Sequence, residues 1–130
     1  MASTPRETPD EVVLAQVLDV WKHGIDVHDT AEISSVFADD VLFQGGKPSP
    51  TRGRASVAAY YDPDPLIGVE YELIDARRSS EHVIVGYSAA HFAFPDGAPT
   101  VHRHLTTVLE RTGDDWLIGH YHVSLVPAAH

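Results

Sequence analysis

The sequence predicts an α+β fold, in which three helices near the N-terminus pack on a curved antiparallel sheet. Three observations support this: apolar residues recur at helical spacing early in the chain, long β-branched and apolar runs follow residue 68, and turn-forming residues separate those runs. The length of 130 residues allows one domain with a sizeable core. We therefore expect a single domain over residues 10–130, behind a polar and disordered arm of residues 1–9.

The helices are predicted from their spacing and their boundaries. The first is opened by Thr8-Pro9-Asp10-Glu11, whose acidic residues suit the positive end of the helix dipole. Its apolar stripe comprises Val13, Val17, Val20, Trp21 and Ile25. A short second helix is expected over residues 30–37, and a third over 54–61, ended by two Asp-Pro pairs. A strand over 41–44 and a loop over 45–53, rich in glycine and proline, lie between them.

Four long strands are expected over residues 69–78, 82–94, 102–111 and 116–126, with turns between them. Because side chains alternate along a strand, one face of the last strand would carry Trp116, Ile118, His120, His122 and Ser124, and the other Leu117, Gly119, Tyr121, Val123 and Leu125. Neither set is typical of a solvated surface. We therefore predict a homodimer through the outer face of the sheet, which a charge at Ile118 or His120 would separate.

Composition argues against several classes of function. The chain has 19 acidic and 9 basic residues and a net charge of −10, which disfavours nucleic acid and anionic membranes as partners. It contains no cysteine, so thiolate nucleophiles and cysteine-ligated zinc are excluded. The sequence shows neither a membrane-spanning apolar stretch nor a signal-peptide pattern, and it has no Gly-x-Gly-x-x-Gly motif. We therefore expect a cytoplasmic protein that works without a cofactor.

Three segments resemble a known family. They are Phe37-Ala38-Asp39-Asp40-Val41, Gly53-Arg54, and the run from Trp116 to Ser124. With the order of elements, they are similar to the nuclear transport factor 2-like superfamily, and within it to SnoaL-like proteins of the SgcJ/EcaC type. The last run also resembles the closing strand of the calcium/calmodulin-dependent kinase II association domain. The resemblance spans residues 10–126 and implies a cone-shaped α+β barrel, a fold that hosts isomerases, dehydratases, cyclases and non-enzymatic binders.

The catalytic residues of these relatives do not carry over to this chain. Gly45 takes the place of the ketosteroid isomerase general base, and glycine cannot transfer a proton. Trp21 falls near the isomerase's oxyanion-hole tyrosine, and Thr106 or Thr107 falls at its protonated aspartate. The two pocket arginines of the kinase association domain fall at Thr107 and Val123. The comparison therefore implies no steroid isomerase chemistry, and whether the chain is an enzyme stays open.

The resemblance does imply which side chains face the interior of the cone. The predicted ligand pocket comprises Trp21, Phe43, Tyr61, Phe92, Arg103, Leu105, Thr107, Tyr121 and Val123. Of Tyr60 and Tyr61, one is expected to pack inward and the other to lie at the surface. An apolar lining with a few polar groups is usual for small-molecule sites. We expect cofactor-independent binding or conversion of a hydrophobic small molecule, such as a polyketide-like natural-product intermediate. The alternative is a non-catalytic ligand-binding or oligomerisation module, favoured by the missing catalytic residues.

Besides His82 at the start of a predicted strand, five of the nine histidines lie on predicted strands: His91, His102, His104, His120 and His122. Two His-x-His pairs could present imidazoles to a metal ion. One histidine could instead be a general acid or base, with His91, His104 and His122 as the candidates. In the third interpretation they are packing and hydrogen-bonding residues of the outer sheet face. No carboxylate lies at the alternate strand positions beside these pairs, where it could act as a further metal ligand. We therefore expect no bound metal, and we favour the third interpretation.

Overall fold

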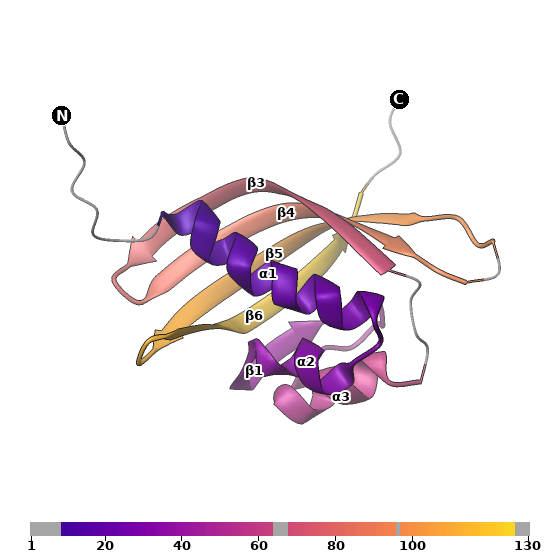
Figure 1. Cartoon of the computed structure of the whole chain (residues 1–130), viewed down its shortest axis with the longest axis horizontal. Helices are drawn as coiled ribbons and strands as arrows, with labels where there is room; N and C mark the ends of the chain where they lie inside the picture. The colour runs from indigo at the N-terminus through magenta and orange to yellow at the C-terminus, as the bar shows by residue number, and fades with distance from the viewer. Residues whose placement is uncertain (1–8, 64–67, 96, 127–130) are drawn as a thin grey trace.

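The computed structural model describes residues 9–63, 68–95 and 97–126 (Figure 1). Its elements are α1 (Asp10–Asp26), α2 (Thr30–Ser35), β1 (Phe37–Gln44), β2 (Thr51–Arg52), α3 (Arg54–Tyr61), β3 (Gly68–Ser80), β4 (Val83–Ala93), β5 (Val101–Thr112) and β6 (Asp115–Leu125). The predicted N-terminal arm lies outside the described residues except for Pro9, as do residues 127–130 of the predicted domain. The carbonyl of Pro9 accepts the amides of Val12 and Val13 at 3.0 and 3.1 Å. Pro9 is therefore the N-cap residue of α1.

The described strands form one curved, open sheet in the order β2-β1-β6-β5-β4-β3. From β3 to β6, each strand pairs antiparallel with the next, as short turns between consecutive strands require. The strand β1 instead pairs in parallel with β6. The α+β fold class is thus confirmed, with the difference that the sheet is mixed rather than purely antiparallel. The parallel pair joins two distant parts of the chain, so no local pattern indicates it.

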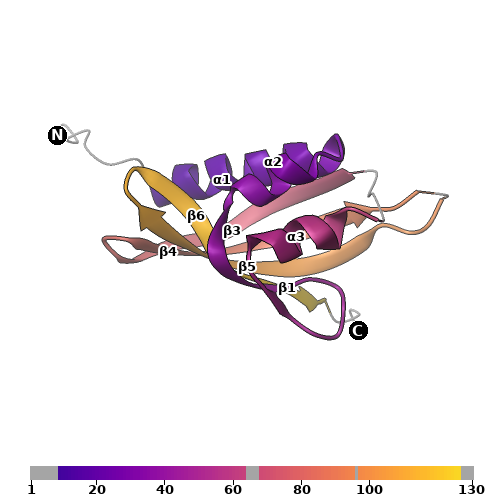
Figure 2. The same cartoon turned by 90° about the horizontal axis from the view of Figure 1, so that it is seen from below.

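Helix α1 lies across one face of the sheet, here called the inner face (Figures 1 and 2). Its buried residues are Val13, Leu14, Val17, Leu18, Trp21, Gly24 and Ile25. The sheet contributes the inward side chains of Ile84, Ala90, Leu105, Leu109, Ile118 and Tyr121 to the same core. Complete burial of one large apolar side chain contributes about 1.5–3 kcal/mol. The apolar stripe of α1 therefore holds the helix against the strands, as its spacing predicts.

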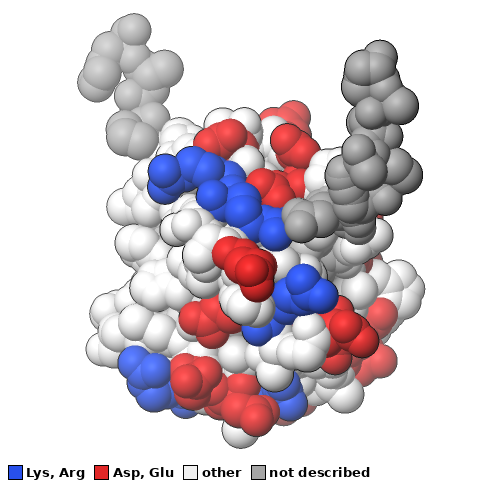
Figure 3. Space-filling view, turned by 90° about the vertical axis from the view of Figure 1, so that its left-hand side faces the viewer, with Lys and Arg blue, Asp and Glu red and all other residues white. Residues whose placement is uncertain are grey.

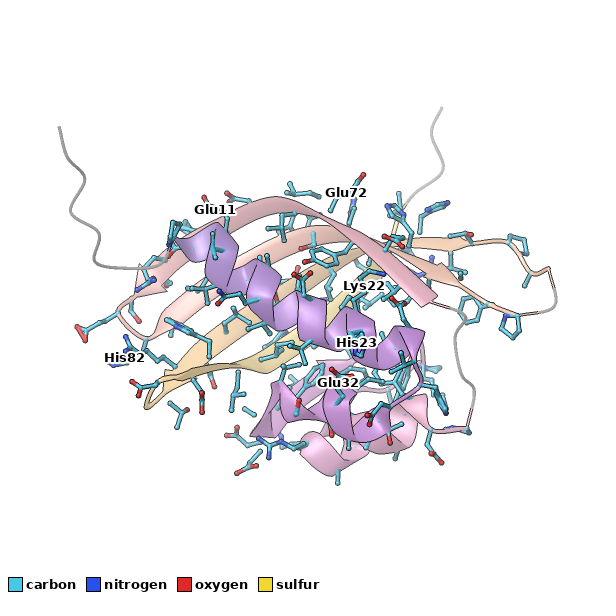
Figure 4. All side chains as sticks on the ribbon, viewed as in Figure 1. Glu11, Lys22, His23, Glu32, Glu72 and His82 are labelled. Atoms are coloured by element: carbon cyan, nitrogen blue, oxygen red, sulfur yellow. The ribbon has the colours of Figure 1, made fainter. Side chains whose placement is uncertain are left out.

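Polar contacts tie the C-terminal end of α1 to its neighbours, and Figure 4 shows His23 beside Glu32 of α2. The Nδ1 atom of His23 lies 2.7 Å from Oε1 of Glu32. Lys22 pairs with Asp26 at 2.7 Å and donates to the carbonyl of Val69 at 2.8 Å. Asp26 in turn accepts the amide of Val69 at 3.1 Å. These contacts fix the first residues of β3 against the helix.

A β-bulge at Gly119 changes which residues of β6 face the core. The pairing of β5 with β6 skips Gly119, which lies between the paired residues Ile118 and His120. Ile118 is fully buried and Tyr121 is 1% exposed, and Trp116 packs partly buried against the same core. The prediction that Trp116 and Ile118 share the outer face with His120 is therefore wrong. A charge at Ile118 would enter the core instead of separating two subunits.

The segment between α2 and β1 also differs from the prediction. The second helix ends at Ser35 instead of residue 37, and β1 begins at Phe37 instead of residue 41. The carbonyl of Val36 accepts the amide of Ile118 at 2.7 Å, and Phe37 is the register partner of Ile118. Pairing with β6 thus extends the strand at the expense of the helix. The short strand β2 lies inside the predicted loop and pairs with β1.

Acidic and basic side chains are interspersed over the end of the molecule that Figure 3 shows. At the N-terminal end of α1, Arg78 pairs with Asp10 at 2.9 Å and its guanidinium carbon lies 5.2 Å from the centre of the Trp116 ring. These contacts connect α1, β3 and β6. Within the described residues, no helix is both long and apolar enough to cross a bilayer.

Candidate functional site

A cavity of about 310 Å³ lies between α3, the loop that follows β1, and the adjoining ends of β4, β5 and β6. Five residues of the predicted pocket line it: Tyr61, Phe92, Arg103, Tyr121 and Val123. Tyr61, Phe92 and Tyr121 are buried and form its floor, whereas Arg103 and Val123 are half-buried. The cavity therefore has an aromatic floor and a more polar, accessible wall.

The other four predicted pocket residues lie in the core behind this floor. The Phe43 ring stacks on that of Tyr121 with centroids 4.6 Å apart, and Trp21 packs edge-on against Phe92 at 6.1 Å. Leu105 and Thr107 are inward-facing residues of β5 with 0% and 1% exposure. The hydroxyl of Thr107 has no hydrogen-bond partner within the described part of the chain. These four residues support the cavity from behind and do not line it.

Six further residues line the cavity and were not predicted to do so: Gly45, Gly46, Lys47, Tyr60, Phe94 and Val101. Two of them could have been found from strand alternation, since Phe94 continues the inward positions of Phe92 and Val101 continues those of Arg103. Tyr60 was expected to be the alternative to Tyr61, yet both face the cavity.

The loop after β1 is held at the cavity by two side-chain contacts. The Gln44 amide donates to the carbonyl of Lys47 at 2.6 Å, and the Tyr60 hydroxyl accepts the amide of Gly46 at 2.7 Å. Gly45 lies so close to the Tyr60 ring that an added Cβ would come within 2.5 Å of it. A larger side chain at Gly45, such as a carboxylate, would therefore displace Tyr60. Packing against Tyr60 therefore explains a glycine at this position.

Three ring side chains connect the floor of the cavity to the core. Trp21 Nε1 donates to the hydroxyl of Tyr61 at 3.3 Å, and the hydroxyls of Tyr61 and Tyr121 lie 3.4 Å apart. Burial raises the pKa of the Tyr61 hydroxyl and that of the Tyr121 hydroxyl well above the ordinary phenol value. Both phenols are therefore neutral at physiological pH. They can donate and accept hydrogen bonds but are poor bases.

The five strand histidines lie on the opposite, outer face of the sheet. The Nδ1 atoms of His91 and His102 are 2.7 Å apart, so one ring must donate and the other accept. His104 packs against the ring of Tyr87 at 5.4 Å. His120 and His122 have ring centroids 6.5 Å apart, and His122 is exposed. The acid–base candidates His91, His104 and His122 therefore lie outside the cavity.

The chemistry available in the cavity follows from its polar groups. They are the phenols of Tyr60, Tyr61 and Tyr121 and the cations of Lys47 and Arg103. Neither a carboxylate nor an imidazole is among its lining residues in the described part of the chain. Likewise, the described residues contain no group of three histidine or acidic side chains that could hold a metal ion. The site can thus bind a ligand through apolar contact, hydrogen bonds and positive charge.

Several solved structures share this fold. A Xanthomonas campestris protein named as a calcium/calmodulin-dependent protein kinase II association domain is 17% identical, with a TM-score of 0.76, over 98% of this chain and 95% of that one. An NTF-2-like protein of unknown function from Shewanella oneidensis is 14% identical, with a TM-score of 0.75, over 88% and 98%. A Novosphingobium aromaticivorans protein named as a scytalone dehydratase is 9% identical, with a TM-score of 0.72, over 92% and 95%. At these identities the likeness establishes the fold alone.

The sequence itself provides the assignment to a family. No curated protein matches it. The profile of the SnoaL-like domain (SnoaL_3) matches residues 14–129, which include every residue that lines the cavity. The chain shares its fold with the NTF2-like structures above, and on the profile match it belongs to the SnoaL-like domain family.

Proposed function

We propose that the chain binds a hydrophobic small molecule in the cavity beside α3, and that any conversion of this ligand proceeds without a cofactor. The observation that carries the proposal is the floor of Tyr61, Phe92 and Tyr121 at the bottom of an open cavity of about 310 Å³. Ligand sites commonly combine an apolar, aromatic lining with a few polar groups. The flat rings suit an aromatic, polyketide-like body. Natural-product metabolism and a cytoplasmic location remain predictions.

The proposal is tested by titrating the protein with phenylnaphthylamine, a neutral dye that fluoresces in apolar surroundings. Val123→Trp would fill the cavity from its half-buried wall, whereas Val12→Trp makes the same change at an exposed position of α1. We expect saturable binding that Val123→Trp weakens by about tenfold or more and Val12→Trp leaves within about twofold, since Val12 does not line the cavity. No binding to the parent protein, or equal loss in both variants, would contradict the proposal.

A second copy of the chain is the partner that we propose for the outer face of the sheet. Four half-buried residues form a row across neighbouring strands on this face: Val85, Val108, His120 and Leu42. Three of the four are apolar, and apolar side chains side by side on one face of a sheet favour association with a like surface. This observation supports the alternative of an oligomerisation module, which is compatible with a ligand in the cavity.

The dimer is tested by light scattering on Val108→Glu, with Ser79→Glu as a charge-matched control at an exposed position of β3. We expect a dimer for the parent and the control, and a monomer for Val108→Glu, because a charge in the middle of an apolar interface opposes association. A monomeric parent protein at micromolar concentration would contradict the proposal.

A further inference from the structure

The mouth of the cavity carries positive charge although the protein as a whole is acidic. The net charge of the chain is −10, yet the charged side chains that line the cavity are Lys47 and Arg103. Several cations elsewhere are neutralised at short range, as when Lys22 pairs with Asp26 and Arg54 pairs with Asp39. In the described part of the chain, neither Lys47 nor Arg103 lies within ion-pair distance of a carboxylate. These two cations are therefore available to a ligand.

Local contacts place both cations beside the aromatic floor. The backbone of Lys47 is fixed by the Gln44 amide, and its ammonium lies 5.7 Å from the centre of the Tyr60 ring. Arg103 is an inward-facing, half-buried residue near the start of β5, and its Nη1 donates to the carbonyl of His102 at 2.9 Å. A guanidinium has five N–H donors, so most of its donors remain for an acceptor in the cavity.

An acidic group on the ligand would satisfy this arrangement better than a neutral one. Hydrogen bonds between ionised partners are roughly twice as strong as those between neutral partners. The planar fork of arginine matches the two oxygens of a carboxylate or sulfonate, and the lysine adds a second, adjustable charge. The long-range field of an acidic protein repels anions. At this cavity the two unpaired cations oppose that repulsion and favour an anion locally.

We propose that the ligand of this cavity is an amphipathic anion. Its aromatic body lies on the floor of Tyr61, Phe92 and Tyr121, and its acidic group, such as a carboxylate or an ionised phenol, is held at the mouth by Arg103 and Lys47. This inference rests on the proposed function, because it names the class of ligand for the same cavity. It concerns binding alone and requires no bond to form or break.

Two dyes that differ by one group test the inference. Anilinonaphthalene sulfonate has the ring system of phenylnaphthylamine with an added sulfonate. We expect the sulfonate to bind the full chain about tenfold more tightly than the neutral dye, the effect of roughly one charge-assisted contact. Arg103→Met and Lys47→Met keep the apolar bulk and remove the charge. Each should reduce this preference, and the double variant should abolish it, so that the two dyes bind with equal affinity.

Arg77→Met is the matched control, because Arg77 is an exposed residue of β3 opposite Val85 on the outer face. It should leave both affinities unchanged. If both dyes bind equally to the parent, the inference is overturned while the proposed function stands. If the preference survives in the double variant, the acidic group is held elsewhere and the inference is overturned too. If neither dye binds, the proposed function itself fails, and the inference fails with it.

Discussion

The two faces of the sheet differ in chemistry. The inner face carries aromatic rings, aliphatic side chains and a few hydroxyls beneath α1, and it opens at one end into the cavity. The outer face carries the histidines His91, His102, His104, His120 and His122, together with half-buried apolar side chains. Residues that usually attract attention as catalysts are therefore on the face without the cavity. A high histidine count in a sheet is thus a poor guide to the functional site.

The contrast also shows how a sheet divides two tasks between alternate residues of the same strand. On β5, Arg103 reaches the cavity, while its neighbours His102 and His104 lie on the outer face. Because adjacent side chains point to opposite faces, a one-residue shift in register exchanges the two chemistries. The following predictions test the assignment of residues to faces and to the cavity.

The largest effect is expected for Ile118→Asp. Ile118 and His122 are both even-numbered residues of β6 and would share a face without the bulge at Gly119, but Ile118 is fully buried and His122 is exposed. An unpaired charge in the core should lower the free energy of unfolding by about 4 kcal/mol or more. His122→Asp should change it by about 0.5 kcal/mol or less. Urea unfolding followed by circular dichroism measures both, and similar losses would contradict the bulge.

Alkaline pH should destabilise the inner face through its phenols. Burial raises the pKa of the Tyr61 and Tyr121 hydroxyls, so in the folded state both stay protonated above the unfolded value of about 10. The stability that they contribute is present below about pH 10 and is lost as the pH rises further. Unfolding free energies measured at several alkaline pH values should fall less steeply in Tyr121→Phe. An unchanged slope in that variant would count against a buried, neutral Tyr121.

A smaller effect is expected at the loop that borders the cavity. In Gly45→Ala the new methyl would lie 2.5 Å from the Tyr60 ring, whereas the nearest atom to a methyl at Gly46 would be the Tyr60 hydroxyl at 3.3 Å. Overpacking of this kind costs about 1–3 kcal/mol, so Gly45→Ala should destabilise the protein more than Gly46→Ala. The difference should disappear when Tyr60 is also replaced by alanine. Thermal unfolding of the variants in both backgrounds measures this coupling.

The smallest effect is expected for the buried hydroxyls of Ser88 and Thr107. Neither hydroxyl has a hydrogen-bond partner within the described residues, and each side chain is 1% exposed. Removing an unsatisfied buried hydroxyl should leave stability unchanged or raise it by up to about 1 kcal/mol. Thr107→Val should also leave the affinity for phenylnaphthylamine unchanged, because Thr107 lies behind the floor of the cavity. Weaker binding would place its hydroxyl in contact with the ligand.

The parts of the fold that follow from local patterns were predictable from the sequence. The stripe of α1 and the alternation on β5 depend on neighbouring residues, and Leu105 and Thr107 face inward as predicted. For the part of β6 that precedes Gly119, simple alternation predicts the wrong face, because the bulge shifts the pattern by one residue. A glycine inside a strand pattern is itself a sign of a bulge or of a close approach. Here Gly119 has the Glu110 carboxylate where its own Cβ would be.

The rest depends on contacts between distant parts of the chain. The parallel pairing of β1 with β6 decides where β1 begins, and neither strand indicates the other. Likewise, Lys47 lies at the cavity because Gln44 and Tyr60 hold its loop, whereas composition alone describes that segment as a flexible loop. The aromatic floor was thus predictable from alternation and the family resemblance, but the charged mouth was not.

The most direct test of this account is a crystal structure of the protein with bound anilinonaphthalene sulfonate. The account predicts density for the dye on the inner face, with its rings against Tyr61, Phe92 and Tyr121 and its sulfonate beside Arg103. Density confined to the outer face, among His91, His102 and His104, would contradict it. In that case the cavity would be no more than a gap in the packing, and the histidine face would be the functional surface.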